Sequence, residues 1–149
     1  MTAEPSFFIR DYWAADYPHV ADIWERTGIS TPGRGDTAEV IENTLRRKGR
    51  LLVVVDKESN TVVGTSWLTN DGRRLYLHHF AIDPKFQGGG LSKPLLRESL
   101  KIAREIGLQI KLEVHRDNKR AIHFYEKAGF KRLGDYDVYI IRDLNDIKE

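Results

Sequence analysis

The spacing of hydrophobic and polar positions predicts a strand and two helices in the first third of the chain. Residues 7–12 are expected to form an opening strand, and residues 16–26 place apolar side chains at helical spacing. The next stretch, 30–36, is too rich in glycine and proline to be regular. A second helix is expected from about Thr37, with one apolar side and a basic end.

The middle of the chain changes to patterns that predict strands. Residues 51–55 form a continuous apolar run, which is typical of a strand covered on both faces. Residues 61–68 and 75–82 each follow turn-forming residues. The three segments are therefore expected to form an antiparallel meander.

The last part of the chain predicts a strand–helix–strand unit. A glycine loop precedes a helix over 91–106, a strand over 110–114 and a helix over 119–128. Gly129–Arg142 is expected to form a last strand or hairpin. The whole pattern predicts an α/β (α+β) fold, a mixed sheet with a meander followed by a βαβ unit and with helices on both faces.

Length and composition narrow the class of protein. The chain has 149 residues, of which 40% are hydrophobic and 31% charged, and this predicts a single domain over residues 1–149. It has no cysteine, so disulfides, thiolate metal ligands and an acyl-cysteine intermediate are excluded. The net charge of +2 is too small for a nucleic-acid-binding surface. No segment approaches the roughly 18 apolar residues of a membrane span. We therefore expect a soluble, cytoplasmic protein with no nucleic-acid or membrane partner, and no metal, because the histidines lack metal-ligand spacing.

The first candidate chemistry lies in the loop Gln87–Ser92, between an expected strand and an expected helix. Its three consecutive glycines let the backbone turn sharply and leave N–H groups uncovered. The helix start adds unpaired N–H groups and a partial positive charge. Such a cradle suits a pyrophosphate, although a flexible surface turn has the same glycines.

Two other nucleotide-binding motifs do not fit this loop. A Walker-type loop requires a lysine directly after the last glycine, where Leu91 stands. A dinucleotide fingerprint that begins at Gly88 requires a glycine where Lys93 stands.

The loop and a later segment together resemble two motifs of the GNAT N-acetyltransferase superfamily. Phe80–Ser92 is similar to its acetyl-CoA motif, a strand with an apolar-x-Pro step and then Gln/Arg-x-x-Gly-x-Gly/Ala, except that Ser92 takes the last position. Asn118–Phe130 resembles the second motif. Two motifs in this order are more specific than either one, and the resemblance covers about residues 53–130.

The resemblance implies an acetyl-CoA-dependent N-acetyltransferase. The strand before the loop would pair with the pantetheine arm, and Asn118 would contact the cofactor. Tyr125 would lie near the sulfur as the proton donor, and Glu113, twelve positions earlier, would be the base. The implied cofactor-binding residues are Phe80, Ala81, Ile82, Gln87, Gly88, Gly89, Gly90, Leu91, Ser92, Asn118 and Tyr125.

The reaction itself requires such groups. An amine with a pKa near 10.4 is neutral in only about one molecule in 2,500 at pH 7, a handicap of roughly 4.6 kcal/mol. A base that accepts its proton and an acid that protonates the thiolate each typically contribute about 10²–10⁴-fold. His78, His79 or a chain of water molecules are alternative bases. As neighbours on a strand, the two histidines are expected to point to opposite faces. Without cysteine, direct transfer in a ternary complex is the simplest mechanism.

Two alternatives to an enzyme are left open by the sequence. A non-catalytic acyl-CoA-binding regulatory module would share the glycine loop. An interaction domain, which would form a homodimer through the hairpin at residues 135–141, would share the apolar pattern there, as would an ordinary edge strand.

The amine acceptor, a small molecule or a protein amine, is not defined by the sequence. We expect its cleft between the first two helices, about residues 24–39. Trp24, Asp36 and Glu39 suggest an apolar wall with acidic rims, which suits a cationic amine.

Overall fold

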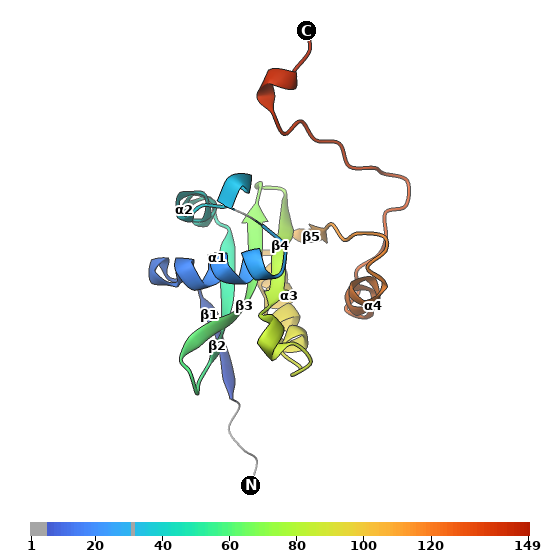
Figure 1. The fold of residues 1–149 in the computed structure, drawn as a ribbon. Helices are drawn as coiled ribbons and strands as arrows, with labels where there is room; N and C mark the ends of the chain where they lie inside the picture. Colours follow the sequence, from blue (N-terminus) through green and yellow to red (C-terminus); the bar gives the residue numbers. More distant parts are fainter. Residues whose placement is uncertain (1–5, 31) are drawn as a thin grey trace. The chain divides into compact units, whose positions relative to one another are not determined.

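A computed structural model describes residues 6–30 and 32–149 (Figure 1). The chain divides into two compact units, residues 1–113 and residues 114–149. The position of one unit relative to the other is not determined, so each is described by itself.

Among the described residues, the first unit contains a five-stranded sheet and three α-helices. The strands are β1 (Phe7–Asp11), β2 (Arg50–Asp56), β3 (Thr61–Asn70), β4 (Arg74–Ile82) and β5 (Gln109–Leu112). The α-helices are α1 (Tyr17–Arg26), α2 (Ala38–Arg46) and α3 (Ser92–Ile106), and short 3-10 turns cover Ala14–Asp16, Pro32–Arg34 and Pro84–Phe86. The strand order is β1-β2-β3-β4-β5, with antiparallel pairing throughout except between β4 and β5, which are parallel and joined by α3.

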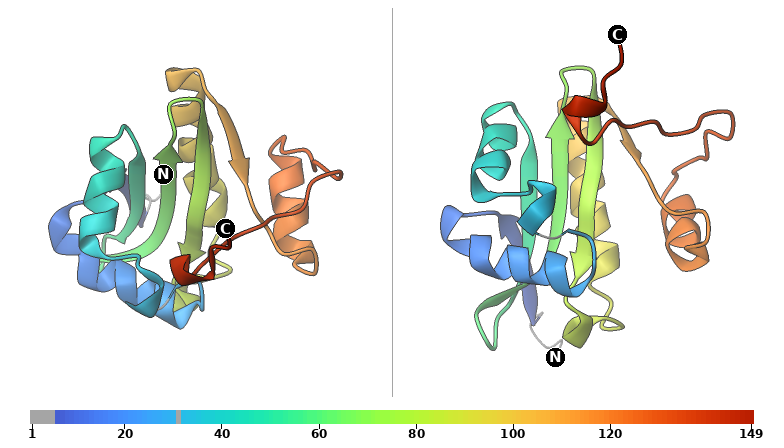
Figure 2. Two further views of the ribbon diagram at one scale, coloured as in Figure 1. Left: turned by 90° about the horizontal axis from the view of Figure 1, so that it is seen from above. Right: turned by 45° about the horizontal axis from the view of Figure 1, so that its top comes forward.

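Helices cover both faces of this sheet, as the sequence predicts (Figures 1 and 2). On the face of α1 and α2, Trp24 and Trp67 stack with their ring centroids 5.4 Å apart at the centre of the core. Both indole N–H groups are satisfied, since Trp24 donates to Thr65 Oγ1 and Trp67 donates to Thr44 Oγ1, each at 2.9 Å. On the other face, α3 packs its buried Leu95.

The elements predicted for residues 7–112 form within a few positions of their expected ends. The strand β2 is buried along almost its whole length, because both faces of the sheet are covered there. The antiparallel meander of β2, β3 and β4 is confirmed.

The second unit contains α4 (Lys119–Lys127) and a 3-10 turn at Leu144–Asp146. The expected strand or hairpin over Gly129–Arg142 is wrong, because no strand is present within residues 114–149. A strand requires a neighbouring strand that shares its backbone hydrogen bonds, and residues 114–149 contain no such strand. Large apolar side chains of this segment are exposed instead, Tyr139 by 93% and Tyr136 by 78%. The alternative of an interaction domain that forms a homodimer depended on this hairpin, which the structure does not contain.

Candidate active site

The glycine loop connects the 3-10 turn after β4 to the first residue of α3. Gly88 and Gly90 have φ angles of +82° and +79°, a region that favours glycine, and nothing lies within 4 Å of a Cβ built at either position. Leu91 is buried and anchors the helix start, and no side chain caps α3. Exposed backbone at an uncapped helix N-terminus fits a diphosphate, which the loop N–H groups and the helix dipole would both attract.

Polar contacts hold the start of this loop. Gln87 donates from Nε2 to the carbonyl oxygen of Ile82 at 3.0 Å, so its side chain binds the loop to the end of β4. Arg26 of α1 donates two hydrogen bonds of 2.8 Å each to Asp83. These bonds lower the pKa of Asp83. The loop is therefore fixed both to β4 and to α1.

The strand β4 runs past its parallel neighbour before it reaches the loop. The ladder with β5 ends at the pair Leu77–Leu112, whereas β4 continues to Ile82. Ala81 and Ile82 are buried and pair with β3, and Phe80 is half-buried. The residues expected along the pantetheine arm thus lie beyond the last pair with β5.

A β-bulge in β4 changes the direction of the two histidines. The register with β3 shifts between Thr65 and Trp67, and His79 has a φ of +47°, unusual for a residue with a side chain. The rings of His78 and His79 both contact Trp67, at centroid distances of 6.0 and 5.2 Å. Both side chains therefore lie on the face of α1 and α2, and the expectation that they point to opposite faces is wrong, because the extra residue of the bulge breaks the alternation.

His79 is held by a polar network from the loop between α1 and α2. Its Nε2 lies 2.9 Å from Asp36 Oδ2, and Ser30 donates to the same oxygen at 2.5 Å. The backbone oxygen of His79 accepts a hydrogen bond of 2.7 Å from Thr65. Burial raises the pKa of Asp36, but the hydrogen bonds from Ser30 and His79 outweigh it, so the net shift is downward. Asp36 is therefore an ionised acceptor at neutral pH.

Three further polar groups continue along the same face. His78 makes a 2.7 Å hydrogen bond with Thr69 Oγ1 and stacks on Tyr76 at 4.0 Å. Burial, with the neighbouring charge of His79, lowers the pKa of His78 to about 4. Burial and the Glu113 carboxylate raise the pKa of the Tyr76 hydroxyl. Glu113, expected from the sequence as the base, is exposed just after β5 and neighbours Tyr76 and His78.

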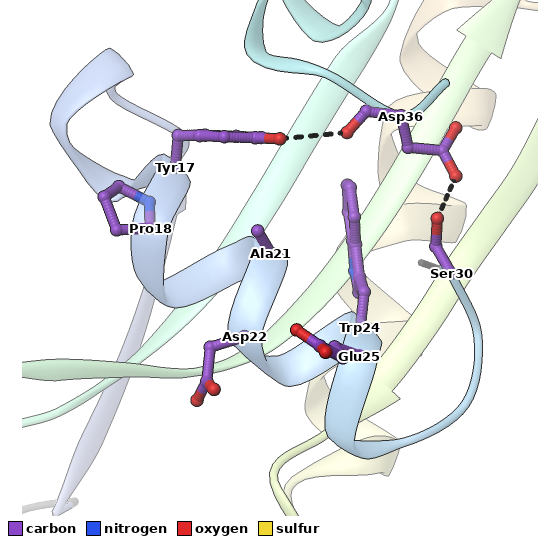
Figure 3. A pocket seen from close by; sticks show the side chains of 8 residues that line it. All are labelled: Tyr17, Pro18, Ala21, Asp22, Trp24, Glu25, Ser30 and Asp36. Atoms are coloured by element: carbon purple, nitrogen blue, oxygen red, sulfur yellow. Dashed lines mark hydrogen bonds between the residues drawn. The ribbon is translucent and has the colours of Figure 1, made fainter. Parts of the chain in front are cut away.

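A pocket of about 190 Å³ opens beside this network (Figure 3). It is lined by Tyr17, Pro18, Ala21, Asp22, Trp24, Glu25, Ser30 and Asp36. Trp24 and Asp36 were expected in the wall of the acceptor cleft, whereas Glu39 is not among the lining residues. The lining includes three carboxylates, so the pocket attracts cations.

The lining residues that precede the expected range of about 24–39 were missed in the sequence, namely Tyr17, Pro18, Ala21 and Asp22. A signal was present for those on α1, because Tyr17, Ala21 and Trp24 follow one another at helical spacing and share a face with Glu25. Glu25 and Ser30 fall within the expected range but were not singled out, and spacing gives no signal for a single residue of the irregular loop that contains Ser30.

The other two expected site residues lie in the second unit. Asn118 is the N-cap of α4, and its Oδ1 accepts a hydrogen bond of 3.2 Å from the backbone of Ala121. The ring of Tyr125 packs against Phe124 and Phe130, with centroids 5.4 and 5.7 Å away. Burial raises the pKa of the Tyr125 hydroxyl to about 12, so it keeps its proton at neutral pH.

The described ranges contain neither a cluster of candidate metal ligands nor a helix that could span a membrane. Within residues 6–30 and 32–149, no group of three or more histidine, cysteine, aspartate or glutamate side chains is arranged to hold a metal ion. None of the helices in the same residues has the length and apolar character that crossing a bilayer requires.

Comparison with known proteins identifies a family. The acetyltransferase (GNAT) family matches residues 9–130, most of the chain. A solved acetyltransferase of the GNAT family from Staphylococcus aureus superimposes with a TM-score of 0.74 at 19% identity, over 88% of this chain and 89% of that one. The fold and the family expected from the sequence are confirmed. The enzyme class of that family is the one expected, acetyl-CoA-dependent N-acetyltransferase.

Two relatives of known activity match about half of the chain. An N-alpha-acetyltransferase, RimI, of Mycobacterium tuberculosis is 37% identical over 82 residues, 52% of this chain and 51% of that protein. A mycothiol acetyltransferase of Propionibacterium freudenreichii is 38% identical over 84 residues, 53% of this chain and 27% of that protein. The aligned regions thus span only about a quarter to a half of these relatives.

Proposed function

We propose that this chain, which belongs to the acetyltransferase (GNAT) family, moves an acetyl group from acetyl-CoA to a primary amine by direct attack in a ternary complex. The observation that carries the proposal is the loop Gln87–Ser92, with two glycines at positive φ before an uncapped helix. This loop provides N–H donors for a diphosphate without a basic side chain at the contact point.

The residues proposed to hold acetyl-CoA follow from that loop. Gly88, Gly89, Gly90, Leu91 and Ser92 would bind the diphosphate through the backbone, and the end of β4 at residues 80–82 would lie along the pantetheine arm. Gln87 would act by fixing the loop to Ile82. In the second unit, Asn118 is proposed to contact the cofactor through its amide nitrogen, because its oxygen caps α4.

Acetyl-CoA would supply an acetyl thioester, and the chain would supply the proton transfers around it. We assign Tyr125 as the donor to the departing sulfur, because its hydroxyl keeps its proton at neutral pH. The acceptor of the amine proton comes from the polar face of β4 and β5, where Glu113, His78 and His79 are the candidates. The chain has no cysteine, so an acyl-cysteine intermediate is excluded.

The amine acceptor is proposed to enter through the pocket beside α1. Asp22, Glu25 and Asp36 would attract a cationic amine, and Trp24 would provide an apolar wall. The two relatives carry different acetyltransferase names, N-alpha-acetyltransferase and mycothiol acetyltransferase, so their names do not indicate one shared acceptor. The acidic pocket favours an amine that carries positive charge.

The test is a thiol-release assay with acetyl-CoA and a panel of primary amines. The protein contributes no thiol of its own, so the background is low. Release that depends on both the amine and the protein is the expected result. Binding of acetyl-CoA without release on any amine would instead favour the regulatory module that lacks turnover.

The loop is tested by Gly90→Val. A β-branched residue at a φ of +79° is strained and crowds the cradle, so the Kd for coenzyme A should rise by more than about ten-fold. Gly72→Val is the matched control, since Gly72 has a φ of +85° and equally open surroundings but lies in the turn between β3 and β4. Calorimetry would measure both, and equal affinities in the two variants would contradict the placement of the diphosphate.

The donor is tested by Tyr125→Phe, which removes the hydroxyl and keeps the ring. Turnover should fall by about ten-fold or more while the affinity for acetyl-CoA stays nearly unchanged. Tyr139→Phe is the control in the same unit, because Tyr139 is 93% exposed. Unchanged turnover in Tyr125→Phe would remove Tyr125 from this role.

A further inference from the structure

We propose that His79 is the residue that accepts the amine proton, and that Asp36 is a positioning residue that holds the His79 ring for this task. The proposal deepens the N-acetyltransferase function above and rests on it. It selects one base among three candidates, and it gives the loop between α1 and α2 a part in the chemistry.

The contacts of His79 connect it to the acceptor pocket. Its ring packs edge-on against Trp24 at 4.6 Å and bonds to Asp36 at 2.9 Å, and both of these residues line the pocket. The side chain is 17% exposed, and it lies directly behind Trp24 and Asp36 rather than among the residues that line the pocket. The bulge in β4 places this residue on the face of α1 and α2, where the pocket lies, because without the extra residue it would face α3.

Asp36 determines which ring nitrogen can accept a proton. A carboxylate that is ionised only accepts hydrogen bonds, so the Nε2 atom beside it must carry the hydrogen. The lone pair of the neutral ring then lies on Nδ1, which becomes the proton-accepting atom. Ser30 also fixes Asp36, because its hydroxyl donates to the same carboxylate oxygen. The same carboxylate would stabilise the imidazolium that forms after proton transfer.

The other two candidate bases, His78 and Glu113, are less well placed to accept a proton from the amine. The ring of His78 is engaged with Thr69 and stacked on Tyr76, and burial disfavours its charged form. Glu113 is exposed and neighbours Tyr76 and His78. The titratable groups around His79 are thus Asp36 from the loop and His78 on β4, with Glu113 next to His78 after β5.

The proton balance defines the role of His79. An ammonium group loses two protons when it becomes an amide nitrogen. His79 accepts the first at Nδ1, which gives the amine its lone pair. The nitrogen then bonds to the carbonyl carbon, the carbon–sulfur bond breaks, and the sulfur leaves with the bonding electrons. The sulfur ends as a thiol by taking a proton from Tyr125, which regains one from the amide nitrogen through water, and His79 returns its proton to the solvent.

The kinetic test compares His79→Asn, Asp36→Asn and the control His19→Asn. Asparagine tolerates positive φ, so His79→Asn keeps the bulge, and His19 is an exposed residue on α1 outside the pocket lining. His79→Asn should lower kcat by about 10²-fold or more and abolish the acid limb of the pH–kcat profile. Asp36→Asn should lower kcat by about ten-fold and move that limb to lower pH, because a neighbouring negative charge is lost. His19→Asn should leave kcat and the profile unchanged.

A second readout does not depend on turnover. In the wild-type protein, the Nε2–H proton of His79 should give a downfield NMR resonance, as expected for a charge-assisted hydrogen bond to a carboxylate. Asp36→Asn should shift this resonance upfield while the melting temperature and the Kd for acetyl-CoA stay close to wild type. A purely structural Asp36 would lower the melting temperature without moving the acid limb.

The outcomes separate this proposal from the function beneath it. Amine-dependent release by the wild type, with an acid limb that survives in His79→Asn, would overturn the assignment of His79 and leave the acetyltransferase intact. An unmoved limb in Asp36→Asn would overturn the role of Asp36. A wild-type protein that binds acetyl-CoA but acetylates no amine would overturn both the proposed function and the base.

Discussion

The two faces of β4 carry different kinds of side chain, and the contrast separates what holds the sheet together from what is available for chemistry. On the face toward α3, Leu75 and Leu77 are 1% and 4% exposed. On the face toward α1 and α2, Tyr76, His78 and His79 form contacts with one another and with the tryptophan pair. One strand therefore contributes alternate residues to an apolar layer and to a polar one.

The difference indicates which conditions and substitutions destabilise each face of the sheet. Burial of hydrocarbon stabilises the α3 face at any pH, since it involves no titratable group. The opposite face buries His78, whose charged form is disfavoured there, so the stability of this face depends on pH. Substitutions on the two faces should therefore differ in both size and pH dependence.

The largest effect is expected on the apolar face, from Leu75→Ala. Removal of a fully buried leucine side chain leaves a cavity and should lower the free energy of unfolding by about 3 kcal/mol. Urea denaturation would measure this loss, and kcat per folded molecule should stay near the wild-type value. A loss below about 1 kcal/mol would show that the α3 face is less tightly packed than the exposure of Leu75 indicates.

A smaller and pH-dependent effect is expected from His78 on the polar face. Its pKa falls from an ordinary value of 6.5 to about 4, so the unfolded chain binds a proton between these values and the folded chain does not. Its contribution is complete above pH 6.5 and is lost as the pH falls toward 4, by about 2 kcal/mol between pH 7 and pH 5.

His78→Asn should remove that part of the pH dependence. Denaturation of both proteins at pH 7 and pH 5 would give the difference, which cancels any constant loss from the Thr69 hydrogen bond. If the free energy of unfolding changed equally between pH 7 and pH 5 in both proteins, the loss of stability in acid would come from groups other than His78. Leu75→Ala should keep the wild-type pH dependence, and so serves as the control from the opposite face.

Much of this contrast could be predicted from the sequence, and the part that could not has a physical cause. The strand positions of residues 75–82 and the glycine loop followed from alternation and from local backbone preferences. The bulge at His79 gave no signal, because a histidine at positive φ looks like any strand residue in the sequence. The bond from His79 to Asp36 joins positions 43 residues apart, and local patterns do not encode such a contact.

The wrong hairpin in the second unit has a related cause. Residues 135–141 have the composition of a strand, but a strand forms only where another backbone accepts its hydrogen bonds. The composition of a segment indicates which side chains it could bury. It does not indicate which other segment could form backbone hydrogen bonds with it. The glycine loop was predictable because its chemistry lies in its own backbone.

The smallest effect in this series tests whether polar contacts stabilise the two faces to the same extent. Thr65 is fully buried on the α1 face, where its hydroxyl accepts from Trp24 and donates to the backbone oxygen of His79. Thr65→Val keeps the shape of the side chain but leaves both partners without a hydrogen bond, which should cost about 1.5 kcal/mol of stability.

The double variant Ser66→Ala/Ser99→Ala is the matched change on the α3 face, where the two hydroxyls lie 2.7 Å apart. It removes both partners together and should cost less than about 1 kcal/mol. Thr65→Val should also lower kcat, since Thr65 binds the bulge that presents His79, whereas the serine pair should leave kcat unchanged. Equal losses of stability and equal kcat values in the two proteins would mean that the polar network is no more closely coupled to the chemistry than the opposite face.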